Sequence, residues 1–375
     1  MSLALMLGGG GARGAYQAGV LRGIARRCPE LHFPIMTGIS AGAINAIHLA
    51  AHSGSMLERT ESLARLWSGL TPDQVFDIRA APLLWNAFRW ASRLASGGIG
   101  GGAKPMRGMV DTQPLREFLT RQLMPNADGS VAGIQRNLDS GLLQAVALSG
   151  ASYTTGQSVT WVQGRGVSLW QRPQRRSEFA ALGVEQVMAS SALPMLFPAV
   201  QVGAEWYGDG GMRLTDPLSP SIHLGATKIL TISTRYRRSV AEASSPQTVG
   251  YPPPAQVLGA LYNSVFLDMI DEDIIRLQRM NHLLAALPDD RRAGMKIVDI
   301  MVIRPSRDLG RLAGEFEARL PRIVKYLSRG FGTKQTASPD LLSLILFQPD
   351  YIGALLEIGE RDGEAAAEQL QAFTA

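Results

Sequence analysis

The chain has 375 residues, of which 46% are hydrophobic and 18% are charged. This balance excludes a disordered chain, because it provides enough apolar surface to offset conformational entropy by burial. The formal charge of +5 favours anionic partners, but the basic residues are not interleaved with aromatic ones as in a strand-binding groove. We therefore expect no nucleic-acid partner, and a basic surface that faces either solvent or lipid.

The cysteine content and the length of the apolar runs limit the compartment and the kind of site. Cys28 is the only cysteine, so one chain can form neither a disulfide framework nor a cysteine-rich metal site. Residues 2–7 lack the basic flank and the length of a signal-peptide core, and no run approaches the roughly 18 apolar residues that span a bilayer. We expect a cytoplasmic protein whose contact with membranes is at most peripheral.

The first fifty residues predict two consecutive strand–helix units. Short apolar runs at 2–7 and 33–37 indicate strands, and residues 15–27 and 43–51 have the pattern of buried helices. Further buried, parallel strands are predicted from apolar runs at 142–148, 228–234 and 297–303. The alternation of strands and helices predicts an α/β fold with a mainly parallel sheet.

The remaining segments predict an insertion, a linker and a C-terminal extension. Residues 56–125 form a helical insertion, in which a helix at 82–96 precedes the glycine-rich stretch 97–103. Two interpretations of this pair stay open: a core-packing helix with a flexible loop, or a lid that meets lipid. We predict a main domain, a linker and a mostly helical extension packed on the same domain, over residues 1–235, 236–254 and 255–375.

A glycine-rich loop at residues 8–14 lies between the first strand and the first helix. Its bare amides can turn toward an anion, and the helix dipole adds positive potential. The loop formally matches a dinucleotide motif, but no acid follows the second strand and no Gly-Lys-Ser or Gly-Lys-Thr completes a Walker loop. We predict an oxyanion hole formed by Gly9, Gly10, Gly11, Ala12, Arg13 and Gly14. For the Arg13 side chain, contact with a phosphate and a salt bridge that shapes the turn both stay open.

A second turn carries the candidate nucleophile, Ser40. Residues 38–42 have the G-x-S-x-G spacing that places a serine on a sharp strand-to-helix turn, with glycines relieving the crowding on both sides. An amide-rich loop at the neighbouring strand end would complete the machinery for acyl transfer. We predict a nucleophile elbow made of Ser40 with Gly38, Ala41 and Gly42.

A serine hydroxyl needs a neighbouring base, and the strongest candidate is Asp209. It follows the strand-like segment 199–206 and precedes Gly210 and Gly211, although Asp-Gly-Gly alone is more often a hairpin turn. The five histidines stand in no evident motif, and only His223 follows soon after this carboxylate.

Taken together, these segments resemble the patatin-like phospholipase family. Three of them are similar, in order, to the family's oxyanion loop, nucleophile elbow and dyad aspartate: residues 9–14, 38–42 and 209–211. The stretch 189–194 with Phe197 and Pro198 is similar to the family's segment before the aspartate, and Pro217 stands where the family often has proline. The resemblance covers about residues 1–235, which makes this part the catalytic domain.

The resemblance implies a three-layer α/β/α fold, a Ser40–Asp209 dyad without histidine, no metal or other cofactor, and hydrolysis of lipid esters. Phospholipid, lysophospholipid, neutral glyceride and small esters all stay open as substrates, as does the oligomeric state. Two further hypotheses stay open: an esterase whose triad includes His223, and a non-catalytic lipid- or nucleotide-binding module.

Overall fold

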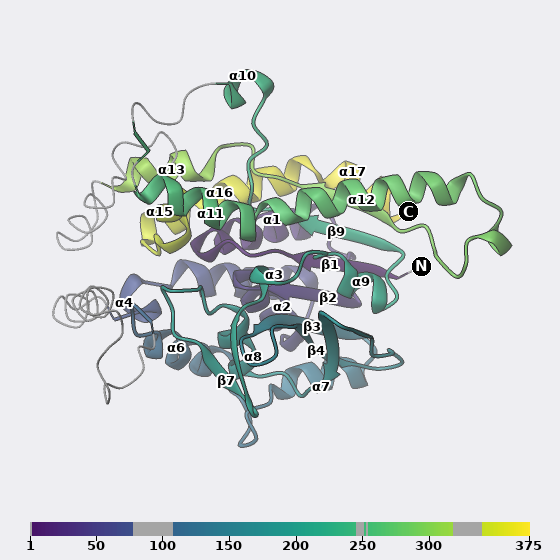
Figure 1. Ribbon diagram of the computed structural model, residues 1–375, viewed down its shortest axis with the longest axis horizontal. Helices are drawn as coiled ribbons and strands as arrows, with labels where there is room; N and C mark the ends of the chain where they lie inside the picture. The colour runs from purple at the N-terminus through teal and green to yellow at the C-terminus, as the bar shows by residue number, and fades with distance from the viewer. Residues whose placement is uncertain (1, 78–107, 245–250, 253, 318–339) are drawn as a thin grey trace.

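The computed structural model describes residues 2–77, 108–244, 251–252, 254–317 and 340–375 (Figure 1). Its centre is a ten-stranded sheet, and five neighbouring strands of this sheet are parallel. In sheet order they are β10 (Asp299–Ile303), β9 (Lys228–Ile232), β1 (Leu3–Leu7), β2 (Ile35–Ile39) and β3 (Ala145–Ser152). The mainly parallel α/β fold expected from the sequence is confirmed.

The sheet continues beyond β3 with mixed strand directions. β4 (Ser158–Gly164) is antiparallel to β3, followed by β6 (Arg175–Phe179) and β5 (Gln171–Arg172). A hairpin of β7 (Val200–Val202) and β8 (Glu205–Asp209) joins through β8, which also pairs antiparallel with β3. The strand expected near 199–206 is therefore this hairpin.

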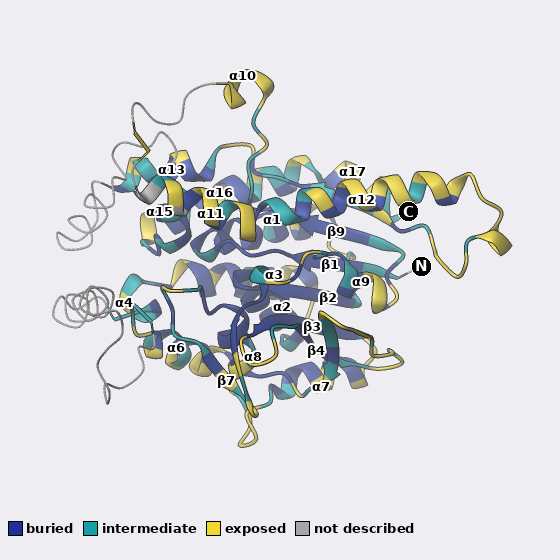
Figure 2. Ribbon diagram, in the orientation of Figure 1, coloured by how far each residue is buried: buried dark blue, intermediate teal, exposed yellow. Residues whose placement is uncertain are grey.

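The central strands are buried on both faces because helices cover the sheet on each side (Figure 2). Along β1, Leu5 and Leu7 belong to one apolar cluster, and Ala4 and Met6 belong to the other, as the two-residue period of a strand requires. The first cluster includes residues from α1 (Gly14–Arg27), α2 (Ala41–Ala51), α3 (Met56–Ser68) and α16 (Pro349–Ala365). The second includes residues around α9 (Ser219–His223) and on α12 (Asp268–Ala285).

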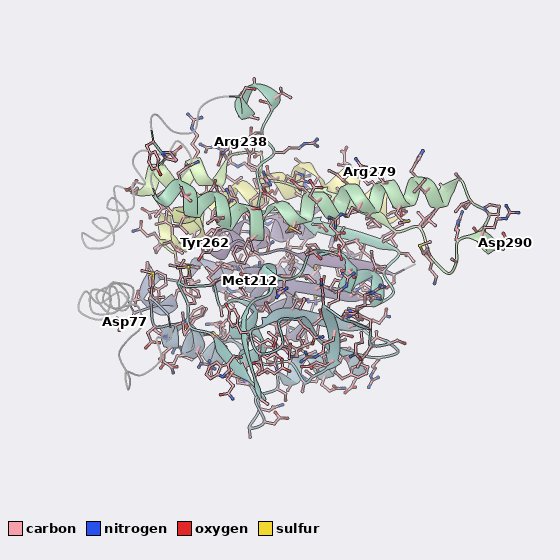
Figure 3. The ribbon with its side chains drawn as sticks, in the orientation of Figure 1. Asp77, Met212, Arg238, Tyr262, Arg279 and Asp290 are labelled. Carbon is pink, nitrogen blue, oxygen red and sulfur yellow. The ribbon has the colours of Figure 1, made fainter. Side chains whose placement is uncertain are left out.

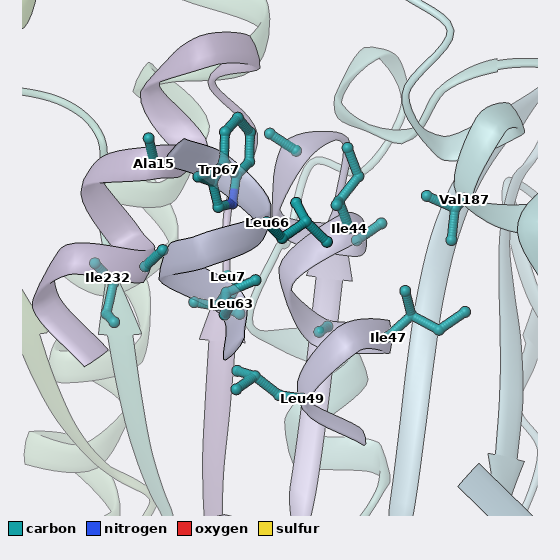
Figure 4. Packing of buried hydrophobic residues seen from close by; sticks show 14 of the residues in the cluster. Leu7, Ala15, Ile44, Ile47, Leu49, Leu63, Leu66, Trp67, Val187 and Ile232 are labelled. Carbon is teal, nitrogen blue, oxygen red and sulfur yellow. The ribbon is translucent and has the colours of Figure 1, made fainter. Parts of the chain in front are cut away.

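The first part of the expected insertion belongs to the core. On α3, Leu63, Leu66 and Trp67 pack with Leu7 of β1 and Ile44 of α2 in the first cluster (Figure 4). The Trp67 indole also donates a hydrogen bond of 2.7 Å to Asn45 Oδ1. These contacts assign α3 to the helical layer on that face. The predicted helix 82–96 and the glycine stretch 97–103 lie outside the described residues.

Helix α16 crosses α1 at very short range. A Cβ atom on Gly19 or Gly23 of α1 would lie 2.2 Å from a carbonyl oxygen of α16, and one on Gly359 or Gly363 would lie 2.2 Å from an oxygen of α1. Each helix thus brings two glycines, four residues apart, to the crossing. Glycine is required there because any side chain would push the two backbones apart.

The other helical segments complete the layers. They are η1 (Gly11–Arg13), α4 (Pro72–Val75), α6 (Gln113–Leu123), α7 (Ala132–Asp139), α8 (Val184–Ser190), η2 (Gly210–Met212), α10 (Val240–Ala243), α11 (Pro254–Phe266), η3 (Asp289–Arg291), α13 (Leu309–Phe316), α15 (Asp340–Ile345) and α17 (Ala367–Thr374). Within the described ranges, no helix combines the length and the apolar character needed to cross a membrane.

Three predicted boundaries need correction. The second strand begins at Ile35 instead of residue 33, since Pro34 has no N–H to contribute to a ladder. This strand also continues through Gly38 to Ile39, since Gly38 pairs with Leu7 of β1 and with Leu148 of β3. The turn predicted over residues 38–42 is therefore shorter than expected. The strand expected at 142–148 is shifted to Ala145–Ser152.

Candidate active site

Ser40 occupies the single residue between β2 and α2. Its backbone has φ 56° and ψ −127°, a conformation that is strained for any residue with a side chain. The turn also brings neighbouring backbones very close together, so glycine is needed on both sides of Ser40. A Cβ on Gly42 would lie 2.0 Å from the Leu7 carbonyl oxygen, and a Cβ on Gly38 would lie 2.4 Å from the Gly42 carbonyl oxygen. Ser40 therefore stands at the positive end of the α2 dipole.

Asp209 is brought to Ser40 by the register of the sheet. β2 runs parallel to β3 and its last residue, Ile39, pairs with Ser149. β8 approaches from the opposite direction along the same edge of β3, and its last residue, Asp209, pairs with Gly150. The two strands thus end at adjacent positions of β3, and Ser40 and Asp209 meet there.

The carboxyl group of Asp209 is fully buried, and burial raises its pKa to about 7. The Ser40 hydroxyl and the Gly211 amide oppose this rise, and the Gly211 N–H donates to Oδ1 at 2.9 Å. The Ser40 hydroxyl is near enough to lower the pKa of Asp209, yet Oδ2 accepts no fully formed hydrogen bond from a described residue. Catalytic hydrogen bonds are often this loose before a substrate binds.

A hydroxyl-bearing segment at the end of α8 holds both residues in place. Ser190 Oγ accepts from the Ser40 amide at 3.0 Å and donates to the Ser149 carbonyl at 2.6 Å. Ser191 Oγ donates to the Ser40 carbonyl at 3.0 Å. The Asp209 amide donates to the Ala192 carbonyl at 2.9 Å. This explains in physical terms why Ser-Ser-Ala precedes the aspartate in the sequence.

The glycine loop lies beside Ser40. A Cβ on Gly9 would be 3.2 Å from Ser40 Cβ, and the next two residues have φ values of 156° (Gly10) and 54° (Gly11) that favour glycine. The Gly10 amide donates to no backbone acceptor among the described residues, and the same holds for the amide of Ala41, the first residue of α2, whereas the Ala43 amide donates to the Ser40 carbonyl at 2.9 Å. Backbone N–H groups without a backbone acceptor are therefore present both on the glycine loop and at the turn of Ser40.

The amides of Arg13 and Gly14, at the end of the predicted oxyanion loop, donate within the turn itself. The Arg13 amide donates to the Gly10 carbonyl at 3.0 Å, and the Gly14 amide donates to the Gly11 carbonyl. Both N–H groups are consumed by the tight turn, so neither can face an anion. Gly14 instead allows Trp67 to approach, since a Cβ there would lie 2.6 Å from its ring.

The Arg13 side chain points away from Ser40 and fastens the loop to α15. It is 3% exposed, pairs with Asp340 Oδ1 at 2.5 Å, and donates from Nε to Ser343 Oγ at 2.8 Å. Gly11 fits against the same helix, because a Cβ there would lie 2.0 Å from the Leu344 carbonyl oxygen. The guanidinium thus shapes the turn through a salt bridge, and its partners were invisible to sequence reasoning because they lie more than 320 residues away.

His223 is not brought to the carboxylate. Its ring stacks on Trp170 with the centroids 4.6 Å apart, and burial, Arg172 and Arg175 lower its pKa. The groups that act on the pKa of Asp209 are Ser40 and Gly211, with no histidine among them. The described residues also contain no cluster of three histidine, cysteine or acidic side chains able to hold a metal ion.

The corner between α11 and α12 covers this site, which sequence reasoning missed. Ser40 is only 3% exposed, and the cavity beside Gly9 and Ile39 is also lined by Val265, Phe266, Met269 and Ile270. A larger cavity of about 670 Å³ lies elsewhere, lined by Arg235, Arg237 and several acids, and neither Ser40 nor Asp209 borders it. No sequence motif in the C-terminal third indicates that the corner between α11 and α12 covers the site.

Comparison with known proteins places the chain in a family. The family model described as patatin-like phospholipase matches residues 5–222. No curated protein matches the chain. Two solved structures resemble it: VipD from Legionella pneumophila, at 15% identity over 81% of this chain and 61% of that one, with a TM-score of 0.37; and human GIVD cytosolic phospholipase A2 in complex with methyl γ-linolenyl fluorophosphonate, at 13% identity over 100% and 59%, with a TM-score of 0.44.

The chain spans about three fifths of the length of these two structures. The family model itself matches more than half of the chain, and its matched residues include the glycine loop, the elbow and Asp209. This chain belongs to the patatin-like phospholipase family.

Proposed function

We propose that this protein hydrolyses carboxylic esters of lipids, with Ser40 as nucleophile and Asp209 as the only protein base. The observation that supports this most is the fully buried carboxyl of Asp209, whose pKa is raised to about 7 next to a serine at a helix N-terminus. A carboxylate with an ordinary pKa is a poor base, whereas one near 7 is matched to proton transfer at neutral pH.

In the proposed reaction, Ser40 Oγ attacks the ester carbonyl carbon while its proton passes to Asp209. The negative charge that develops on the carbonyl oxygen faces the amides of Gly10, Gly11 and Ala41, supported by the α2 dipole. The leaving alcohol takes the proton from Asp209, and the acyl group remains on Ser40. Asp209 then accepts a proton from water, whose oxygen attacks the acyl carbon, and returns a proton to Ser40 as the fatty acid leaves.

The decisive experiment measures release of free fatty acid from mixed phospholipid micelles, with chelator present throughout. Wild type is expected to hydrolyse the lipid, and Ser40→Ala and Asp209→Asn are each expected to lose at least about a thousandfold in rate, since each removes a reacting group. A fluorophosphonate probe is expected to label wild type and to leave Ser40→Ala unlabelled.

Each hypothesis gives a different pattern in this experiment. Activity that survives in Asp209→Asn would show that the base lies elsewhere, and activity lost in His223→Ala would restore the triad. Liposome binding without hydrolysis or labelling by wild type would favour the binding module.

Ser190 is proposed to position the nucleophile through its two buried hydrogen bonds. Ser190→Ala leaves the Ser40 amide and the Ser149 carbonyl without this partner, so we expect kcat to fall about tenfold with little change in KM, and stability to fall by about 1 to 3 kcal/mol. The assay should be normalised to the sites that the fluorophosphonate labels. A rate per labelled site equal to that of wild type would mean that Ser190 only stabilises the fold.

A further inference from the structure

The cavity that the described residues form beside the turn of Ser40 is small. The cavity beside Gly8, Gly9 and Ile39 has a volume of about 10 Å³, which is room for about one water molecule. Pockets that bind small organic ligands measure about 300 to 1,000 Å³. Whatever fills the remaining space next to the nucleophile therefore decides which acyl groups can enter.

Side chains from the corner between α11 and α12 occupy the space on either side of Ser40. The ring of Phe266 lies against the loop after the aspartate, since a Cβ on Gly211 would be 2.5 Å from its Cδ1. Ile270 lies on the glycine loop, since a Cβ on Gly8 would be 2.5 Å from its Cδ1. Both side chains are buried, at 9% and 5% exposure. They bridge the two segments that flank the nucleophile, and the residues lining the cavity are uncharged.

The corner is held in place by specific hydrogen bonds. Tyr262 lies on α11 (Figure 3). Its hydroxyl donates to the carbonyl of Pro194, just after the segment that holds Ser40 and Asp209, at 2.5 Å. Asn263 donates to Asp340 Oδ2 at 2.6 Å, and Asp340 also pairs with Arg13 of the glycine loop. Phe266 and Ile270 therefore stand on an element that is tied to both sides of the site.

This corner lies outside the part of the chain that the family model matches, residues 5–222. It is contributed by the C-terminal extension, so its side chains belong to this chain and not to the shared family segment.

We propose that Phe266 and Ile270 form one wall of the acyl-binding subsite, so that kcat/KM falls as the acyl chain of the ester lengthens. This inference rests on the proposed function for the identity of the ligand. One methylene in an apolar pocket changes specificity by about 10- to 200-fold, so a wall this close to the nucleophile discriminates steeply between chain lengths. Shortening either side chain makes room for a longer acyl group.

The test compares p-nitrophenyl butyrate with p-nitrophenyl octanoate. Wild type is expected to prefer butyrate in kcat/KM, and Phe266→Ala and Ile270→Ala are each expected to raise the octanoate-to-butyrate ratio at least tenfold. Ile270→Val, which removes a single methylene and keeps most of the packing, is expected to move the ratio in the same direction by less. Ile275→Ala is the matched control, because Ile275 lies on the exposed side of the same helix at 40% exposure.

A second measurement separates this inference from the proposed function. Binding of butyrate and octanoate to Ser40→Ala protein, with and without Ile270→Ala, requires no hydrolysis. A gain of at least tenfold in octanoate affinity supports the wall, even if wild type cleaves no ester. Ratios and affinities that stay unchanged in the folded variants, or a wild type that prefers octanoate, would overturn the proposal.

Discussion

Replacement of Asp209 by asparagine is expected to stabilise the protein at pH 8 while it removes the proposed activity. The folded-state pKa of Asp209 is about 7, above its usual 3.8, because burial disfavours the charged carboxylate. Its contribution to stability is therefore fully present below about pH 3.8 and is lost as the pH rises to about 7. Each unit of this pKa difference corresponds to about 1.4 kcal/mol. Asparagine avoids the loss, since it cannot ionise and can still accept from Gly211.

The measurement is the free energy of unfolding of both proteins between pH 4 and pH 9. The advantage of Asp209→Asn should grow from pH 4 to about pH 7 and then stay level. Over the same range, wild-type kcat/KM should rise about tenfold per pH unit below 7 and level off above it, because only the ionised carboxylate can accept a proton. An advantage that does not depend on pH would show that the pKa of Asp209 is the same in the folded and the unfolded protein.

Gly359→Ala is expected to destabilise the protein by about 3 kcal/mol, the upper end of the usual cost of overpacking. The new methyl group would lie 2.2 Å from the Tyr16 carbonyl oxygen, and a backbone atom can move away only if α1 and α16 separate. The same separation would strain the glycine loop, since α1 begins at Gly14, immediately after it. Chemical denaturation at fixed temperature measures the effect.

Gly353→Ala on the same helix is the matched control. No atom lies within 4 Å of the position its methyl group would take. Alanine is favoured over glycine in a helix by up to about 1 kcal/mol, so this variant should be slightly more stable than wild type. If both substitutions destabilised the protein equally, the loss in Gly359→Ala would not come from the close crossing of α1 and α16.

Most of the local features were predictable because each depends on neighbouring residues. The strand, turn and helix around Ser40 follow from a short apolar run, two glycines and a second apolar run. The glycine loop at residues 8–14 was predictable in the same way, because it lies between an apolar run that predicts the first strand and the pattern of the first helix. The pair Gly359 and Gly363 was visible as a four-residue spacing, yet the sequence does not say which helix would pack there. Its partner pair, Gly19 and Gly23, lies more than 300 residues away.

The sequence by itself determined the α/β class and the sharp turn at Ser40 with its flanking Gly38 and Gly42, because backbone conformation and strand burial are set by short stretches of chain. The tertiary structure decided the rest. It buried Asp209 and so raised its pKa, it joined Arg13 to Asp340, and it placed Phe266 and Ile270 against Gly211 and Gly8, on either side of Ser40. Each of these depends on side chains from distant segments meeting in a shared, water-poor space, and no local pattern specifies which segments meet.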